Sequence, residues 1–279
     1  MAGLAIAAAD PVLTPSELAA VPGTEGYQVR RAILTALAGI PGDDAALALL
    51  DYCDPTYRSL HENARHAPLA RFAAALLAKR AALSETVRQT MSTRILTLRE
   101  PQVRRDLFRR LGAEGALERT WLRKLALTSK VERRRALAAD ALLFNAAAIT
   151  PGFLEGVSAD AVAVAPIEAA ASLTRLIGLR GEATQVDRLL ARLAGRADLA
   201  ALAVLLVAPQ APDRNQRIAD LFPADHPARG LADPASGQVG FNALDEVATP
   251  AVILQIRRLL PERFEPKPQP TWPMSHGLL

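Results

Sequence analysis

The hydrophobic positions of this chain recur with the spacing of α-helices over most of its length. The clearest case is the stretch 101–112, in which four apolar side chains fall within one arc of about 140° around a helix. Pro101 suits the first position of a helix, and Gly112 suits the residue just past its end. The sequence therefore predicts a helix between these two residues. Its apolar face consists of Val103, Leu107, Phe108 and Leu111.

Similar patterns, opened by Pro, Ser, Thr or Asp and closed by Gly or Pro, repeat along the chain. Asp43, Ser84 and Ser158 are predicted to cap or mark helix starts, and Pro166 predicts a break. Because β-branched runs are short, no extended sheet is expected, and the prediction is an all-α chain of about a dozen helices. The main ones are expected at about 26–39, 43–53, 57–66, 68–83, 85–98, 101–111, 117–125, 129–149, 167–179, 184–194, 199–208, 213–222 and 250–260.

The same spacing predicts which side chains face the core. Leu117, Trp121 and Leu125 form an apolar stripe that is expected to point inward. Lys79 and Arg80 are expected on an outward face. Half of the residues are apolar but only 4% are aromatic, so the core should be mostly Ala and Leu, with thin layers of side chains between close helices.

Changes in composition divide the chain into five parts. Residues 1–13 form an N-terminal arm, and 14–222 form a helical-repeat domain. A loop rich in Pro and Gly follows at 223–241, and the C-terminal helices at 242–261 are expected to pack on the same domain. Residues 262–279, which are rich in Pro, should form an extended or disordered tail.

Two helix openings repeat without a gap. Gln28-Val29-Arg30-Arg31 and Gln102-Val103-Arg104-Arg105 lie 74 residues apart, which is twice 37. With Pro101 in front, the second opening resembles the Pro-x-Val-Arg start of HEAT or armadillo-type repeats, whose units are about 40 residues long. The resemblance covers residues 25–150 better than 160–260.

The resemblance implies an α-solenoid of stacked antiparallel helix pairs, a curved slab whose concave face binds something extended. It implies no particular chemistry. The competing interpretation is a compact helical domain without repeats.

Arg30 and Arg104 occupy equivalent positions within the apolar faces of these two helices. A charge in such a position needs a partner, or its long side chain must reach water. We expect inter-repeat ion pairs, in which each arginine meets an Asp or Glu of the neighbouring unit. Contact with a ligand is the alternative.

The block from Arg99 to Arg135 holds twelve Lys or Arg against five Asp or Glu, on a chain whose net charge is only +4. Its simplest interpretation is a solvated face partly neutralised by its own carboxylates. The alternative is a groove that follows nucleic-acid phosphates, although Trp121, at core spacing, is the block's single candidate for base stacking. The candidates for binding a partner or phosphates are Arg109, Arg110, Arg119, Arg123, Lys124, Arg133, Arg134 and Arg135.

No pattern in the chain predicts a catalytic or metal site. His61 and His66 are five residues apart, about 140° around a helix, whereas histidines that bind zinc from one helix are four apart. Cys53, with nearby Asp51 and Asp54, could complete a ligand cluster, but surface histidines and a buried thiol are the better interpretation. We expect no metal and no cofactor, and an active site built from dispersed residues stays open.

Cys53 is the single cysteine, so no disulfide-linked partner is expected and a reducing compartment suits the chain. The longest strongly apolar run, Leu199 to Ala208, is half the length of a membrane span. The start of the chain lacks the basic residues of a signal peptide. These features predict a cytoplasmic protein without a membrane partner.

The functional expectation is a non-enzymatic helical-repeat scaffold or adaptor that binds a protein partner. The alternative is a nucleic-acid-binding helical-repeat protein that uses the basic block at 99–135.

Overall fold

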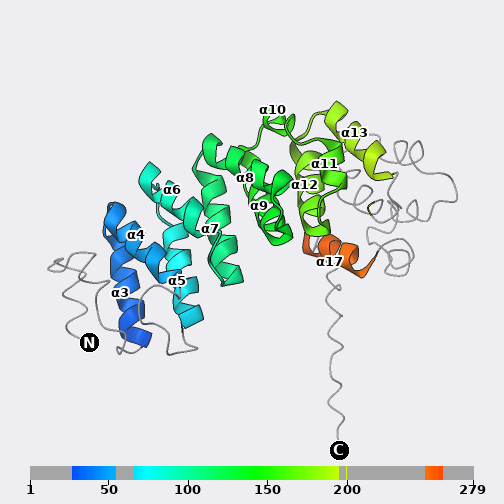
Figure 1. Ribbon diagram of the computed structural model, residues 1–279. Coiled ribbons are helices and arrows are strands. Elements are labelled where there is room, and N and C mark those ends of the chain that lie inside the picture. The colour runs from blue at the N-terminus through cyan, green and yellow to red at the C-terminus, as the bar shows by residue number, and fades with distance from the viewer. Residues whose placement is uncertain (1–26, 55–65, 195–198, 200–248, 260–279) are drawn as a thin grey trace, which may run out of the picture. The chain divides into compact units, whose positions relative to one another are not determined.

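The computed structural model describes residues 27–54, 66–194, 199 and 249–259, and the regular structure among them is entirely helical (Figure 1). The prediction of an all-α chain is therefore confirmed. The arm at 1–13, the loop at 223–241 and the tail at 262–279 lie outside the described residues, as does most of the helices expected at 57–66, 199–208 and 213–222. The chain divides into two compact units between Ile149 and Thr150.

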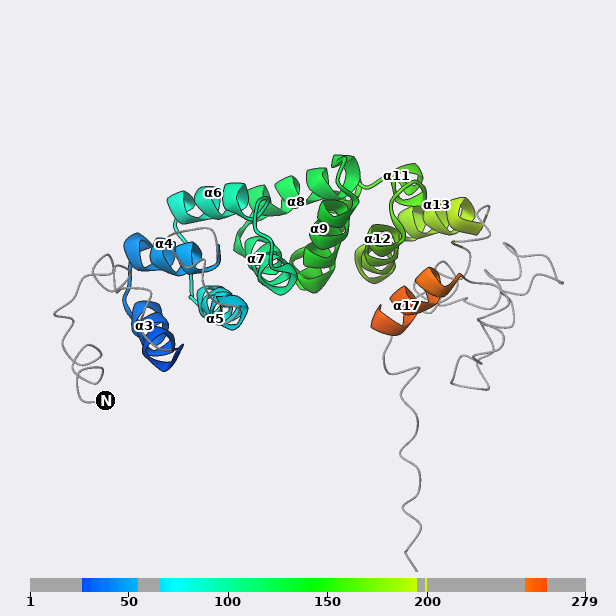
Figure 2. The same cartoon turned by 60° about the horizontal axis from the view of Figure 1, so that its bottom comes forward.

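The helices of the first unit lie in two rows, which Figure 2 shows from the side. In the first row, α3 packs on α5, α5 on α7, and α7 on α9. The second row consists of α4, α6 and α8, which connect these helices in sequence. The bounds are α3 (Tyr27–Gly39), α4 (Asp43–Tyr52), α5 (His66–Ala78), α6 (Glu85–Arg94), α7 (Pro101–Glu114), α8 (Ala116–Thr128) and α9 (Glu132–Phe144), followed by the 3-10 turn η2 (Ala146–Ala148).

The predicted apolar face of α7 is buried completely. Val103, Leu107 and Leu111 have no exposed surface, and Phe108 has almost none. Burying each of the larger side chains stabilises the fold by about 1.5–3 kcal/mol. The helices α4 and α5, which pack on each other, bury mainly Ala together with Leu, which lets them approach closely, as the composition predicts.

The expectation that Gly112 lies just past the end of α7 is wrong. The glycine lies inside the helix, which continues to Glu114. A Cβ at this position would lie 2.6 Å from Asn145 Nδ2 and 3.2 Å from Ala141 O. The Asn145 amide is held in place, donating to Arg109 O at 2.9 Å and to Ala141 O at 2.8 Å. The glycine is therefore needed for the contact between α7 and α9 rather than for a helix stop.

The buried face of α8 differs from the predicted inward stripe of Leu117, Trp121 and Leu125. Leu117 is 80% exposed, whereas Leu122 and Ala126 are fully buried. Leu117 lies about 140° from Leu122 and about 180° from Ala126 around the helix, so it must face away once those two are inside. Trp121 is half-buried and stacks on Phe108 with ring centroids 6.0 Å apart, as its core spacing predicts.

The predicted helix starts are mostly confirmed. Ser84 Oγ accepts from Val87 N at 3.2 Å, and Ser158 Oγ accepts from Ala161 N at 3.1 Å. Asp43 is instead the first residue of α4, and its carboxylate accepts from Ser84 Oγ at 2.7 Å. It therefore joins two helix starts rather than capping its own.

The second unit contains shorter helices around α12. The predicted break at Pro166 is confirmed, because α11 ends before it and α12 begins directly after it. The last of the described helices, α17, packs on α12, and Arg258 donates to the buried Ser172 Oγ at 2.8 Å. The bounds are α10 (Pro151–Leu154), α11 (Ala159–Ala163), α12 (Ile167–Arg180), α13 (Ala183–Ala194) and α17 (Pro250–Leu259).

The substitution Gly112→Ala should destabilise the first unit by about 1–3 kcal/mol, because the added methyl group meets a fixed amide and a backbone carbonyl. The measurement is urea unfolding followed by the fluorescence of Trp121, in a Trp272→Phe background. Gly39→Ala is the matched control, since a Cβ there meets nothing within 4 Å. The control should be neutral or should stabilise by up to about 1 kcal/mol. Equal stability of the two variants would contradict this account.

Candidate functional site

Much of the basic block is built into the fold. Five of the eight candidate binding residues direct a guanidinium nitrogen at a carboxylate or a backbone carbonyl of the first unit. These five are Arg109, Arg110, Arg119, Arg134 and Arg135. Of the other three, Arg123 is half-buried, while Lys124 and Arg133 are exposed. The excess of positive charge that faces solvent is therefore smaller than the excess counted in the sequence.

Four of these arginines share one type of acceptor, a carbonyl at or just beyond the end of an earlier helix. Carbonyls there lack intrahelical donors, and the helix dipole gives them partial negative charge. We call such contacts arginine caps. Arg110 donates to Arg80 O at 2.8 Å beyond α5, Arg134 to Leu96 O at 3.1 Å beyond α6, Arg119 to Gly112 O at 3.3 Å in α7, and Arg135 to Ala126 O at 3.0 Å in α8.

Arg80 makes the most extensive arginine cap. The expectation that its side chain faces outward is therefore wrong. Its guanidinium donates to Leu37 O at 3.4 Å, Ile40 O at 3.0 Å and Gly42 O at 3.1 Å. These three carbonyls form the end of α3 and the turn into α4. Arg80, which lies in the turn between α5 and α6, thus joins that turn to the turn between α3 and α4.

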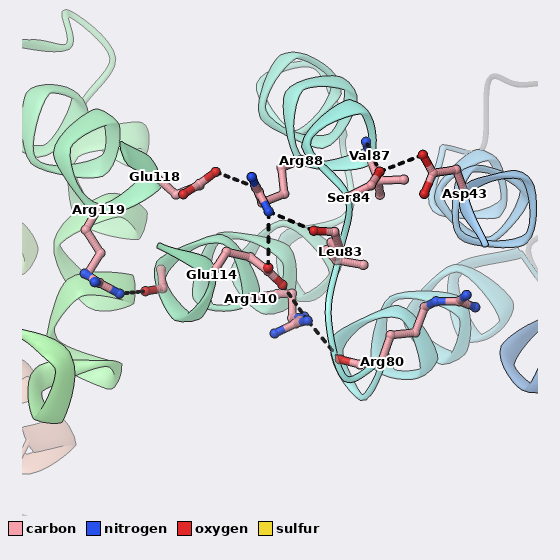
Figure 3. A network of polar contacts seen from close by, with 11 residues as sticks. Asp43, Arg80, Leu83, Ser84, Val87, Arg88, Arg110, Glu114, Glu118 and Arg119 are labelled. Atoms are coloured by element: carbon pink, nitrogen blue, oxygen red, sulfur yellow. Dashed lines mark hydrogen bonds and ion pairs between the residues drawn. The ribbon is translucent and has the colours of Figure 1, made fainter. Parts of the chain in front are cut away.

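A network of charged side chains extends from Arg80 through the second and third helix pairs, as Figure 3 shows. Arg110 contacts Glu114 at 2.5 Å as well as Arg80 O. Arg88 of α6 lies 3.9 Å from Glu114 and 2.7 Å from Glu118 of α8. The Glu114 side chain is only 7% exposed, so its charge depends on these two arginines. The network holds together α6, α7 and α8.

Further ion pairs link neighbouring helices. Arg109 of α7 contacts Asp140 of α9 at 2.9 Å and lies 4.5 Å from the centroid of the Phe144 ring. Asp140 is buried, so this pair fixes the same α7–α9 contact that Gly112 permits. Two other pairs among the described residues of this unit are Arg71 with Glu100 at 2.7 Å and Arg94 with Asp51.

Arg30 and Arg104, the two arginines expected to form inter-repeat ion pairs, differ in their burial and in their contacts. Arg30 is buried, with 5% of its surface exposed, and its ion pair stays a prediction. Arg104 forms no ion pair within the described part of the chain, and its Nε is buried without a hydrogen-bond partner. Burial, and then the nearby charges of Arg133 and Arg134, lower the pKa of Arg104. Within the described residues Arg104 therefore lacks the expected acidic partner in an ion pair, and the inter-repeat pairing stays a prediction.

Cys53 is a buried thiol, as predicted. Its Sγ donates to Leu49 O at 3.4 Å. Burial, followed by the charge of Asp51, raises the pKa of the thiol far above its ordinary value. Asp51 is itself paired with Arg94, so these side chains do not converge on a metal. The described residues contain no group of three or more His, Cys, Asp or Glu that could hold a metal, while His61 and the His66 side chain lie outside them.

A cleft that the sequence did not predict lies in the second unit and has a volume of about 640 Å³. Its walls include Leu154, Asp160, Ile177 and Leu189, and come from α10, α11, α12 and α13. At its edge Arg192 contacts Asp160 at 2.7 Å. Both side chains are largely exposed, so this pair adds little stability and leaves no net charge at the cleft.

Comparison of the chain with protein-family models, with curated proteins and with solved structures gave no match. Within the described residues, no helix combines the length and the apolar character that crossing a bilayer requires.

The sequence analysis missed the residues on which the arginine caps depend. Arg80 and Arg88 lie outside the basic block, and the acceptors of Arg80 lie 38 to 43 residues upstream. No local pattern marks such a pair, because only the stacking of helix pairs brings donor and carbonyl together. A usable signal would have been arginines at a spacing close to the repeat length.

Replacing Arg80 by Met should destabilise the first unit by about 1–2 kcal/mol, because three carbonyls lose a charged donor in a partly exposed position. Met keeps most of the apolar stem, so the loss reports the hydrogen bonds. Urea unfolding followed by Trp121 fluorescence measures the effect. Lys79→Met, at an exposed neighbouring position, is the control and should change stability by less than about 0.5 kcal/mol. An equal effect of both substitutions would refute the cap.

Cys53 should resist thiol reagents in the folded protein. At about pH 8 an exposed cysteine reacts readily through its thiolate, whereas burial keeps this thiol protonated and covered. Labelling with a maleimide, followed by intact mass measurement, should show no adduct before the protein is unfolded and one adduct afterwards. Rapid labelling of the native chain would place the thiol at an accessible site instead.

Proposed function

We propose that this chain is a non-enzymatic helical-repeat scaffold that binds a protein partner. In this proposal the first unit is an α-solenoid of stacked antiparallel helix pairs, similar to HEAT repeats. The single cysteine is compatible with a cytoplasmic location. The supporting observation is the alternation of helices between two rows, with each first-row helix packed on the next. A surface built in this way grows with the number of pairs and suits an extended partner.

The first row also carries a recurring feature that suits recognition. Each of its four helices has an exposed arginine within its first two turns. Some of these are partly engaged, since Arg71 pairs with Glu100 and Arg31 lies 4.9 Å from the Phe72 ring centroid. The four exposed residues are Arg31, Arg71, Arg105 and Arg133. Their recurrence favours the first row over the second as the binding surface.

Binding of nucleic acid through the block at 99–135 receives less support. Such binding needs several cations that follow successive phosphates. Five of the eight candidates instead bind carboxylates or carbonyls inside the unit. Stacking of bases needs an open aromatic face, but within the block Phe108 is buried and Trp121 stacks on it. The exposed ring of Phe144 lies outside the block and is covered in part by Arg109. The protein-binding proposal does not require these groups to be free.

Site-specific photocross-linking in the native cell tests the proposal. A photoreactive amino acid replaces Thr35 or Glu132 on the first row, or Thr93 or Thr120 on the second, all of which are exposed. We expect both first-row positions to give a cross-link to the same protein, identified by mass spectrometry, and the second-row positions to give little.

The matched positions make the result interpretable, because all four variants have the same probe on the same folded unit. Absence of any protein cross-link from the first row, or cross-links only to nucleic acid, would overturn the proposal.

A further inference from the structure

We infer that the exposed arginines of the first row together bind an extended acidic segment of the partner, which presents a carboxylate at about every third residue. The inference rests on the proposed function and specifies the chemistry of the partner. We call this site the arginine ladder, because each of four neighbouring helices contributes one side chain. Its members are Arg31, Arg71, Arg105 and Arg133.

Contacts between the first three helices of the row place their starts side by side. Arg31 of α3 lies 4.9 Å from the ring centroid of Phe72 in α5. Arg71 of α5 contacts Glu100, the residue before α7, at 2.7 Å. The first two arginines of the ladder therefore lie level with each other and with the beginning of α7.

The contact between α7 and α9 places the last arginine at the same level. Arg109 meets Asp140 at 2.9 Å, and further along both helices Gly112 lies against Asn145, so the two helices run in the same direction. Counting back two turns, about seven residues, from the Arg109–Asp140 contact brings Arg133 beside the first turn of α7.

The ladder therefore crosses the row near the helix starts. Packed helices lie about 8–10 Å apart, so four of them give a line about 24–30 Å long. Arg105 lies about one helical turn, or about 5 Å, beyond the start of α7, an offset that its long side chain can compensate.

The described residues of the first row do not neutralise this line of charge. Glu132 is the one exposed acidic residue on its four helices, and the half-buried Asp106 accepts from Gln102 at 2.8 Å. Arg105 and Arg133 form no hydrogen bond or ion pair with the described residues. The surface therefore favours a partner with negative charge.

The other two guanidinium groups are held in position by the fold and still face solvent. Arg31 lies over the Phe72 ring, a contact that uses none of its N–H donors. The Arg71 side chain remains 54% exposed although it is paired with Glu100. Both side chains therefore lose less conformational entropy on binding than freely rotating ones.

The spacing and the residue type match carboxylates on an extended chain. A polyproline II segment has three residues per turn and rises about 3.1 Å per residue, so every third side chain lies on one side, about 9 Å from the last. All four members are arginines, whose planar guanidinium group binds a carboxylate with two hydrogen bonds. The exposed lysines of the unit, Lys79, Lys124 and Lys130, lie outside the first-row helices.

The ladder is too sparse for a nucleic acid. A strand of duplex DNA carries a phosphate about every 3.4 Å, so a line of this length would bring roughly eight phosphates against four cations. The nearest aromatic face, that of Phe72, is covered by Arg31 and does not offer a stacking platform.

Fluorescence anisotropy of the full chain with two labelled peptides tests the spacing at low salt. One peptide is Glu-Pro-Ser repeated four times, and the other has the same composition with its four glutamates adjacent. The spaced peptide should bind at least about threefold more tightly, because the adjacent glutamates span only about 9 Å and reach two of the four arginines.

Substitutions test the site itself. The double variant Arg105→Gln, Arg133→Gln should weaken binding of the spaced peptide about fivefold to tenfold, the effect of losing two exposed ion pairs. The control, Lys79→Gln with Lys124→Gln, removes the same charge from exposed positions outside the first row and should stay within about twofold. If the double variant fails to fold, Arg105→Gln alone serves, with an expected effect of about twofold to threefold.

Four results would overturn the inference. These are no binding of the spaced peptide at low salt, equal or tighter binding of the peptide with adjacent glutamates, equal weakening by the test and control variants, and tighter binding of an oligothymidine of equal charge through the same arginines.

These measurements separate the inference from the function on which it rests. If the spaced peptide does not bind while first-row cross-links to a protein persist, the ladder is wrong and the scaffold stands. If cross-links are absent while the spaced peptide binds through the arginines, the scaffold is wrong and the anion site stands.

Discussion

The first unit depends on the contact between an arginine guanidinium and the free carbonyls at the end of an earlier helix. Short helices in pairs have many ends, and each end leaves carbonyls without donors. Arg80, Arg110, Arg119, Arg134 and Arg135 supply those donors at the ends of α3, α5, α7, α6 and α8. The stacking of one pair on the next is therefore coupled to the completion of the helices themselves.

This use of arginine compensates for a thin core. Many of the buried side chains of α4, α5 and α9 are alanines, whose burial contributes much less free energy than that of leucine or phenylalanine. Close helices allow polar groups to reach across, as Arg88 does to Glu118 and Arg109 does to Asp140. The same closeness demands Gly112, because a larger residue would separate α7 from the Asn145 amide. Small residues and long cations are thus two parts of one packing solution.

The sequence predicted features that depend on neighbouring residues and missed those that depend on stacking. The helix starts at Ser84 and Ser158 and the break at Pro166 follow from local backbone chemistry, and they are confirmed. Arg80 and Gly112 were misread, since they contact Ile40 and Asn145, which lie 40 and 33 residues away in the chain. The basic block was identified from composition, but composition cannot say that five of its ten arginines bind carboxylates or carbonyls of the fold.

All the arginine caps run in the same direction along the chain, since every donor follows its acceptor in sequence. A ribosome that releases the chain from its N-terminus therefore exposes each set of carbonyls before the arginine that satisfies it exists. Each pair reaches its full stability only after the next pair has left the exit tunnel. Deleting residues from the front leaves arginines that water can solvate, whereas deleting residues from the back leaves carbonyls bare. Folding of this unit has a built-in polarity, from its first pair toward its last.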